Sequence, residues 1–144
     1  MNSNISDLTI TIRDLVKGYK NSDEDGVYGY DGNLIIRPEF QREFVYKDAQ
    51  RNAVIDSIMN GYPIGIMYWS LNKSGNYECL DGQQRTISIC DYVNNTFSVK
   101  IAGYPKVFSN LNEDEKESIL NYEVKVYIFS GNETERLEWF KRIN

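Results

Sequence analysis

The chain of 144 residues contains no histidine. Ser-His-Asp triads, Cys-His pairs, His-ligated zinc sites and HNH-type nuclease sites all need an imidazole, so the sequence excludes these classes of chemistry. Only two cysteines occur, Cys79 and Cys90, and each lies in an apolar stretch without CxxC spacing. Neither a cysteine-ligated metal nor a disulfide framework is expected, and the pattern predicts two buried thiols in a reducing cytosol.

The sequence also lacks long apolar runs and an excess of positive charge. No run approaches the roughly 20 apolar residues of a membrane span, and the first residues lack the basic-then-apolar pattern of a secretion signal. We therefore expect a cytoplasmic protein. The net charge is −5, which is unsuited to binding nucleic acid over the whole surface, so any contact with nucleic acid must be local. The length predicts a single domain over residues 1–144.

Hydrophobic periodicity predicts an α+β fold. The apolar spacing and end signals predict helices between Thr11 and Gly18, over 48–60, over 81–94, from 112 onward and over 132–144. Strands are predicted over 34–37, 64–69, 77–80 and 123–129, the second and third as an antiparallel hairpin. Residues 20–33 are acidic and glycine-rich without periodicity, and are predicted to form a loop or insertion. The last helix ends without a capping residue, so we expect this domain to be the front of a longer protein.

The sharpest motif is the run Asp81-Gly82-Gln83-Gln84-Arg85 between a predicted strand and a predicted helix. The first helical turn has unpaired N–H groups and the positive end of the helix dipole, and a glycine lets a ligand approach the backbone closely. The glutamines add amide groups, Arg85 offers a planar fork for phosphate oxygens, and Asp81 is a ligand for hydrated Mg²⁺ or a base that orients water. Alternatively, Asp81 only caps the helix and Arg85 pairs with a carboxylate.

A second candidate segment, residues 37–51, has a positive charge balance. Gln41 and Arg42 are candidates for a second wall of an anion site. The alternative is a solvated loop anchored to the core by its two phenylalanines. The basic side chains of the segment that are candidates for a nucleic-acid contact are Arg37, Arg42, Lys47 and Arg51.

Two further features have ordinary structural explanations. The sequence contains 11 tyrosines, some of which are suited to stacking on bases, although packing in strands is the more frequent role. The acidic run 113–117 has the charge of a DNA mimic or metal site, but it also fits a solvated helix start.

Together the motifs resemble a known family. The matching residues are Pro38-x-Phe40-Gln41-Arg42, the helix 54–61 followed by Pro63-Ile64, Asp81-Gly82-Gln83-Gln84-Arg85, and the closing Phe140-Lys141-Arg142-Ile143-Asn144. This series resembles the DGQQR-motif domain at the N-terminus of GmrSD-type modification-dependent restriction enzymes, over residues 34 to 144. The resemblance implies a ParB/sulfiredoxin-like α+β fold whose strand-to-helix loop binds a nucleotide or phosphodiester. It also implies NTP hydrolysis, often with GTP, coupled to DNA cleavage in antiphage defence.

The sequence departs from the family pattern in two places. Cleavage in many relatives is attributed to a separate C-terminal HNH-like domain, and a chain without histidine is not expected to be an independent nuclease of that type. Residues 20–33 add a segment where family members often pass directly to the Phe-Gln-Arg series. In sulfiredoxin relatives of the fold the corresponding loop carries a catalytic cysteine, whereas here Cys79 precedes the loop, so a redox function is not expected.

The resulting hypothesis is an NTP-binding and NTP-hydrolysing domain that uses GTP or ATP with Mg²⁺. In it, backbone N–H groups from Gly82 to Gln84 and the Arg85 side chain hold phosphates. Arg42 stabilises the developing charge, Asp81 positions the attacking water directly or through Mg²⁺, and Gln41 orients that water or contacts the base. The alternatives are a non-catalytic ParB-like module that binds DNA or a partner, and a fragment that is inert without a missing C-terminal nuclease domain. A homodimer is a further expected partner arrangement.

Overall fold

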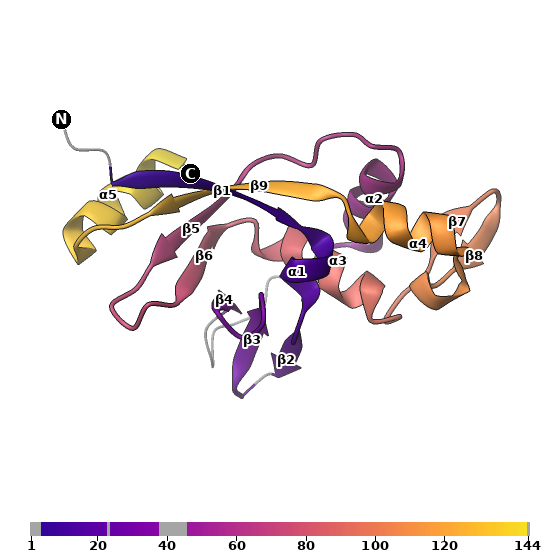
Figure 1. Cartoon of the computed structure of the whole chain (residues 1–144), viewed down its shortest axis with the longest axis horizontal. Helices are drawn as coiled ribbons and strands as arrows, with labels where there is room; N and C mark the ends of the chain where they lie inside the picture. The colour runs from indigo at the N-terminus through magenta and orange to yellow at the C-terminus, as the bar shows by residue number, and fades with distance from the viewer. Residues whose placement is uncertain (1–3, 23, 38–45, 144) are drawn as a thin grey trace.

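The computed structural model describes residues 4–22, 24–37 and 46–143. It confirms the predicted α+β class (Figure 1). In chain order the elements are β1 (Ile5–Thr11), α1 (Ile12–Val16), β2 (Lys20–Ser22), β3 (Gly26–Gly29), β4 (Leu34–Arg37), α2 (Asp48–Met59), β5 (Met67–Leu71), β6 (Tyr77–Asp81), α3 (Gln83–Val93), β7 (Val99–Ile101), β8 (Tyr104–Lys106), the 3-10 turn η1 (Phe108–Asn110), α4 (Glu113–Leu120), β9 (Glu123–Phe129) and α5 (Glu133–Ile143). No helix in this described part of the chain is long and apolar enough to cross a membrane.

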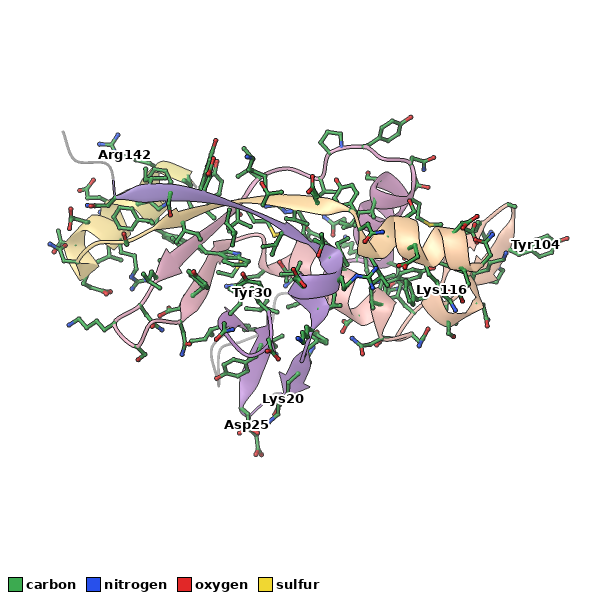
Figure 2. All side chains as sticks on the ribbon, viewed as in Figure 1. Lys20, Asp25, Tyr30, Tyr104, Lys116 and Arg142 are labelled. Carbon is green, nitrogen blue, oxygen red and sulfur yellow. The ribbon has the colours of Figure 1, made fainter. Side chains whose placement is uncertain are left out.

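Seven strands form one mixed sheet in the order β1-β9-β5-β6-β4-β3-β2, and β7 and β8 form a separate hairpin. The pairs β5·β9 and β4·β6 are parallel, while the other neighbours in the large sheet are antiparallel. In Figure 1, α5 lies at one end of the long axis, α2, α4 and β7–β8 lie at the other, and β2, β3 and β4 project from the middle. Tyr104 extends into solvent from the hairpin end in Figure 2 and is 71% exposed.

The strand β9 shows why these residues form a two-faced sheet. Val124, Val126 and Ile128 alternate with exposed or half-buried residues and are buried on one face. Across the parallel pair, Met67 and Trp69 of β5 lie opposite Val126 and Ile128, and both are fully buried. Burying side chains of this size stabilises the fold by about 1.5–3 kcal/mol each. This apolar inner face is the core against which the helices pack.

The helix α3 lies at the centre of the fold, where it packs against α1, α2 and β4. Most of its second and third turns are buried, including Ile87 and Cys90, while Val93 is half-buried. The outer face of the sheet is partly covered at one end by α5, whose Trp139 stacks on Phe129 with ring centroids 5.9 Å apart. A buried α3 fixes the strand-to-helix turn that precedes it.

The periodic elements predicted from sequence are confirmed, except that the strand predicted over 64–69 begins only at Met67. Strands with a weak pattern were not predicted. Residues 20–33, predicted to be a loop or insertion, instead contain the strands β2 and β3. Gly29 of β3 is closely packed, since a Cβ at this position would lie 2.9 Å from the carbonyl oxygen of Leu15. The edge strand β1 was not predicted either, and its first five residues are all exposed or half-buried without alternation. β1 is held in the sheet by its antiparallel pairing with β9 and not by a strong strand pattern of its own.

Candidate functional site at the start of α3

The DGQQR run lies where β6 ends and α3 begins. β6 ends at Asp81, Gly82 is the N-cap, and α3 starts at Gln83. Because β4 and β6 are parallel neighbours, their carboxyl ends lie at the same edge of the sheet. Arg37, the last residue of β4, therefore lies at the edge that carries Asp81.

Gly82 makes the turn possible in two ways. Its φ of 109° is in the left-handed region, which side chains other than glycine rarely adopt. In addition, a Cβ at this position would lie 2.8 Å from Cγ of the fully buried Met67. Since glycine has no side chain, the helix start has no side-chain cap, and its first turn carries backbone N–H groups that the helix itself does not satisfy.

A shallow cavity of about 290 Å³ opens at this helix start. Its lining contains all five residues of the DGQQR run, together with Tyr46 and Leu80. Asp81 is the one carboxylate among these described lining residues, and Arg85 is the one cation. The five motif residues predicted to form a site are thus brought together on one concave surface.

The guanidinium of Arg85 is held at two points. Its Nη1 donates to the carbonyl oxygen of Ile64 at 2.9 Å, and its Nη2 donates to Oδ2 of Asp81 at 3.3 Å. The side chain of Arg85 is 16% exposed and that of Asp81 is 42% exposed. These bonds use two of the five guanidinium N–H groups. The alternative that Arg85 pairs with a carboxylate is therefore confirmed, whereas Asp81 does not cap the helix, because Gly82 occupies that position.

The two glutamines hold neighbouring segments of backbone. Oε1 of Gln84 accepts a hydrogen bond from the N–H of Tyr46 at 3.0 Å, which ties the chain ahead of α2 to the first turn of α3. Nε2 of Gln83 donates to the carbonyl oxygen of Cys79 at 3.4 Å. Gln41 and Arg42 lie outside the described residues.

The other basic candidates do not share one exposed surface. Arg37 is only 2% exposed. The guanidinium of Arg51 lies 3.8 Å from the ring centroid of Phe97 and 3.5 Å from a carboxylate oxygen of Asp48. Lys47 is exposed and begins α2 as its N-cap. Of the three described basic candidates, only Lys47 offers a freely accessible charge to a nucleic acid.

Comparison with known proteins gives the family. Residues 12–144 match the family model described as the GmrSD restriction endonuclease, N-terminal domain. The chain belongs to this family. No curated protein and no solved structure matches it. Membership of a restriction-endonuclease family connects the chain with restriction and antiphage defence.

The thiol next to the turn of this GmrSD-type domain is buried, and its surroundings favour the protonated form. Cys79 is 6% exposed, and its Sγ donates to the carbonyl oxygen of Asp81 at 3.5 Å. Burial raises the pKa of Cys79 to about 12; the charge of Asp81 also raises it, while Arg85 opposes the shift. A thiol with such a pKa stays protonated at neutral pH, and only the thiolate is reactive.

The described residues of the domain contain no group of three or more cysteine, aspartate or glutamate side chains placed to hold a metal ion. Mg²⁺ is commonly bound by one or two carboxylates together with substrate phosphates and water. Asp81, partly exposed and lining the cavity, fits the single-carboxylate form of such a site. Any Mg²⁺ here would therefore depend on a phosphorylated ligand for its remaining coordination.

Sequence reasoning missed the loop that faces the motif. The carbonyl of Ile64 and the neighbouring Gly65 contact Arg85, although neither was a candidate. One signal was present, since a glycine inside an apolar run often marks a close approach of backbone to another group. The apolar run 64–69 predicts one strand, but β5 begins only at Met67. The carbonyl of Ile64, ahead of this strand, accepts the hydrogen bond from Arg85.

Proposed function

We propose that this domain binds a nucleoside triphosphate, GTP or ATP, at the first turn of α3 and hydrolyses it. The observation that carries the proposal is the glycine-capped start of α3, with a mostly buried guanidinium beside it in the same cavity. Anionic phosphates are stabilised where unsatisfied N–H groups and the positive end of a helix dipole meet. The family's link to restriction makes DNA cleavage by another domain the process that hydrolysis would serve.

Each motif residue has a part in this proposal. The N–H groups from Gly82 to Gln84 bind phosphate oxygens, and Gly82 allows the phosphates to approach the backbone. The N–H groups of Arg85 not used on Ile64 and Asp81 add charge-assisted hydrogen bonds to the same oxygens. The contact with Asp81 also orients the guanidinium, so that little side-chain entropy is lost when the ligand binds.

The hydrolytic step depends on positioning and electrostatics, which suits a site without histidine. Asp81 orients the attacking water with the carboxylate oxygen that Arg85 does not contact. Arg42 stabilises the charge that develops on the transferred phosphoryl group, and Gln41 orients the water or contacts the base. When bound, Mg²⁺ supplies neutralisation of the phosphate charge.

The test is a phosphate-release assay on the chain with ATP, GTP, CTP and UTP, each with and without DNA. We expect release with GTP or ATP above the rate of the nucleotide alone. Absence of release with every nucleotide, together with absence of nucleotide binding in a titration, would overturn the proposal. Salt-sensitive DNA binding without phosphate release would instead support a ParB-like binding module, in which Lys47 is the exposed described cation.

A further inference from the structure

The loop between α2 and β5 passes directly over the guanidinium of Arg85. Ile64 in this loop accepts the 2.9 Å hydrogen bond from Nη1 of Arg85. The next residue, Gly65, has a φ of +91°, and a Cβ built on it would lie 2.7 Å from the same Nη1 and 3.8 Å from Cζ. Carbon and nitrogen atoms without a bond between them do not approach this closely, so the guanidinium occupies space that any side chain at position 65 would need.

We propose that Gly65 is a positioning residue for Arg85, and through it for the charge at the first turn of α3. The missing side chain leaves room for the guanidinium to lie flat against the backbone at Ile64 and Gly65 while it also reaches Asp81. Any larger residue at position 65 moves the guanidinium away from both partners. The expected effect on nucleotide binding rests on the proposed function. The contact between Gly65 and Arg85 does not depend on it.

The loop between α2 and β5 is held by hydrogen bonds away from Arg85. An added side chain at position 65 therefore moves the arginine side chain rather than the loop backbone. The hydroxyl of Tyr122 donates to the carbonyl oxygen of Tyr62 at 2.7 Å. The N–H of Tyr62 in turn donates to the carbonyl oxygen of Ser57 in α2 at 2.8 Å. Nη1 of Arg85 is, by contrast, the far end of a flexible side chain. An added methyl group at position 65 therefore displaces the guanidinium.

The same loop contains a matched control. Gly61 also has a left-handed backbone, with a φ of +73°, but a Cβ on it would meet no atom within 4 Å. Gly61→Ala and Gly65→Ala thus place the same side chain at positive φ, and they differ in whether it collides with Arg85. Backbone strain is common to both variants, so a difference between them reports the collision.

The first experiment needs no nucleotide. Phenylglyoxal modifies accessible arginines, and mass spectrometry of the digested protein gives the rate at Arg85, with the exposed Arg13 as an internal reference. We expect Arg85 to react several-fold faster in Gly65→Ala than in the wild type or in Gly61→Ala. Equal rates in the two alanine variants would overturn the assignment of Gly65.

The second experiment measures the binding of ATP and GTP by calorimetry in a double-mutant cycle. We expect Gly65→Ala to weaken nucleotide binding about tenfold more than Gly61→Ala does, and to have no greater effect than Gly61→Ala once Arg85→Ala is present. Additive losses would mean that Gly65 acts independently of Arg85, and the inference would fail. If the wild-type chain binds neither nucleotide, the proposed function fails, and the arginine modification still decides the role of Gly65.

Folding is controlled within the same set of variants. If Gly65→Ala does not fold but the double variant Gly65→Ala/Arg85→Ala does, removal of the guanidinium has relieved the collision, as the inference requires. If both fail to fold while Gly61→Ala folds, the collision with Arg85 is not the cause, and the inference is wrong.

Discussion

Two helix N-termini in this chain carry opposite electrostatic arrangements. At the start of α4, Oδ1 of Asn112 accepts from the N–H of Glu115 at 2.8 Å, and the carboxylate of Glu115 accepts from the N–H of Asn112 at 3.0 Å. Three acidic residues occupy that first turn. At the start of α3, the N-cap is Gly82, the first turn contains no acid, and Arg85 lies beside it.

The comparison shows that the capped start of α4 satisfies backbone donors with its own side chains, whereas the start of α3 has no side-chain cap. The start of α5 repeats the α4 solution, with Asn132 and Glu135 exchanging hydrogen bonds of 2.8 and 3.0 Å. The acidic run 113–117 is accordingly explained by capping and by charge at the positive end of the dipole. Neither a metal nor a mimic of DNA is needed to account for it.

The largest expected effect is on stability, from filling the space at the α3 turn. In Gly82→Ala the new methyl group collides with the buried Met67, and the alanine is held at an unfavourable positive φ. We therefore expect the free energy of unfolding to fall by about 3 kcal/mol. Urea denaturation measures it. Gly103→Ala is the control, since it has a φ of +86° and no neighbour within 4 Å of the added Cβ, and it is expected to lose only about 1 kcal/mol. Equal losses in the two variants would show that the collision does not matter.

The second-largest expected effect is on nucleotide binding, and it comes from removing Arg85 at the start of α3, which has no side-chain cap. Arg85→Ala removes the charge beside α3, and we expect it to weaken nucleotide binding by about 2 kcal/mol, which is roughly 30-fold. Arg136→Ala is the matched control, because Arg136 also pairs with an acid in the first turn of a helix, Glu133 in α5, away from the cavity. Calorimetric titration of both variants with GTP and ATP decides the matter. Unchanged affinity in Arg85→Ala would refute the assignment of this residue.

The smallest expected effect is a loss of stability when the side-chain cap at the start of α4 is removed. Asn112→Ala removes the cap, and we expect the free energy of unfolding to fall by about 1 kcal/mol while nucleotide affinity stays unchanged. Thermal or urea unfolding gives the first quantity and titration gives the second. A loss of nucleotide affinity as large as that of Arg85→Ala would mean that the two helix starts do not differ in function.

Elements with a strong local pattern were predicted well. The α1 cap illustrates this, because Oγ1 of Thr11 accepts from the N–H of Asp14, as its place ahead of an apolar helical face predicts. The hairpin of β5 and β6 and the strand β9 were also confirmed, since each combines apolar residues with clear turn or alternation signals. The β7–β8 hairpin was missed, because its three-residue strands are too short to show a period.

Residues 81 to 85 were assigned to a turn between a strand and a helix from sequence alone, and the structure confirms that location. The signals were local, since a glycine after an apolar strand and before an amphipathic run indicates a helix start within a few residues. What those side chains contact was beyond prediction. Gln84 binds the N–H of Tyr46, 38 residues earlier, and no local pattern encodes a contact of that separation.

The sequence by itself determined the helices, four of the nine described strands, the absence of imidazole chemistry and the position of the motif, because periodicity, caps and residue chemistry act over short stretches of chain. Only the tertiary structure decided that Arg37 is buried, that Arg51 lies on Phe97, and that the backbone at Gly65 meets Arg85. These outcomes depend on packing between elements distant in sequence. The contact between Arg85 and Ile64, 21 residues apart, exists because α3 and the loop ahead of β5 converge on the same end of the sheet.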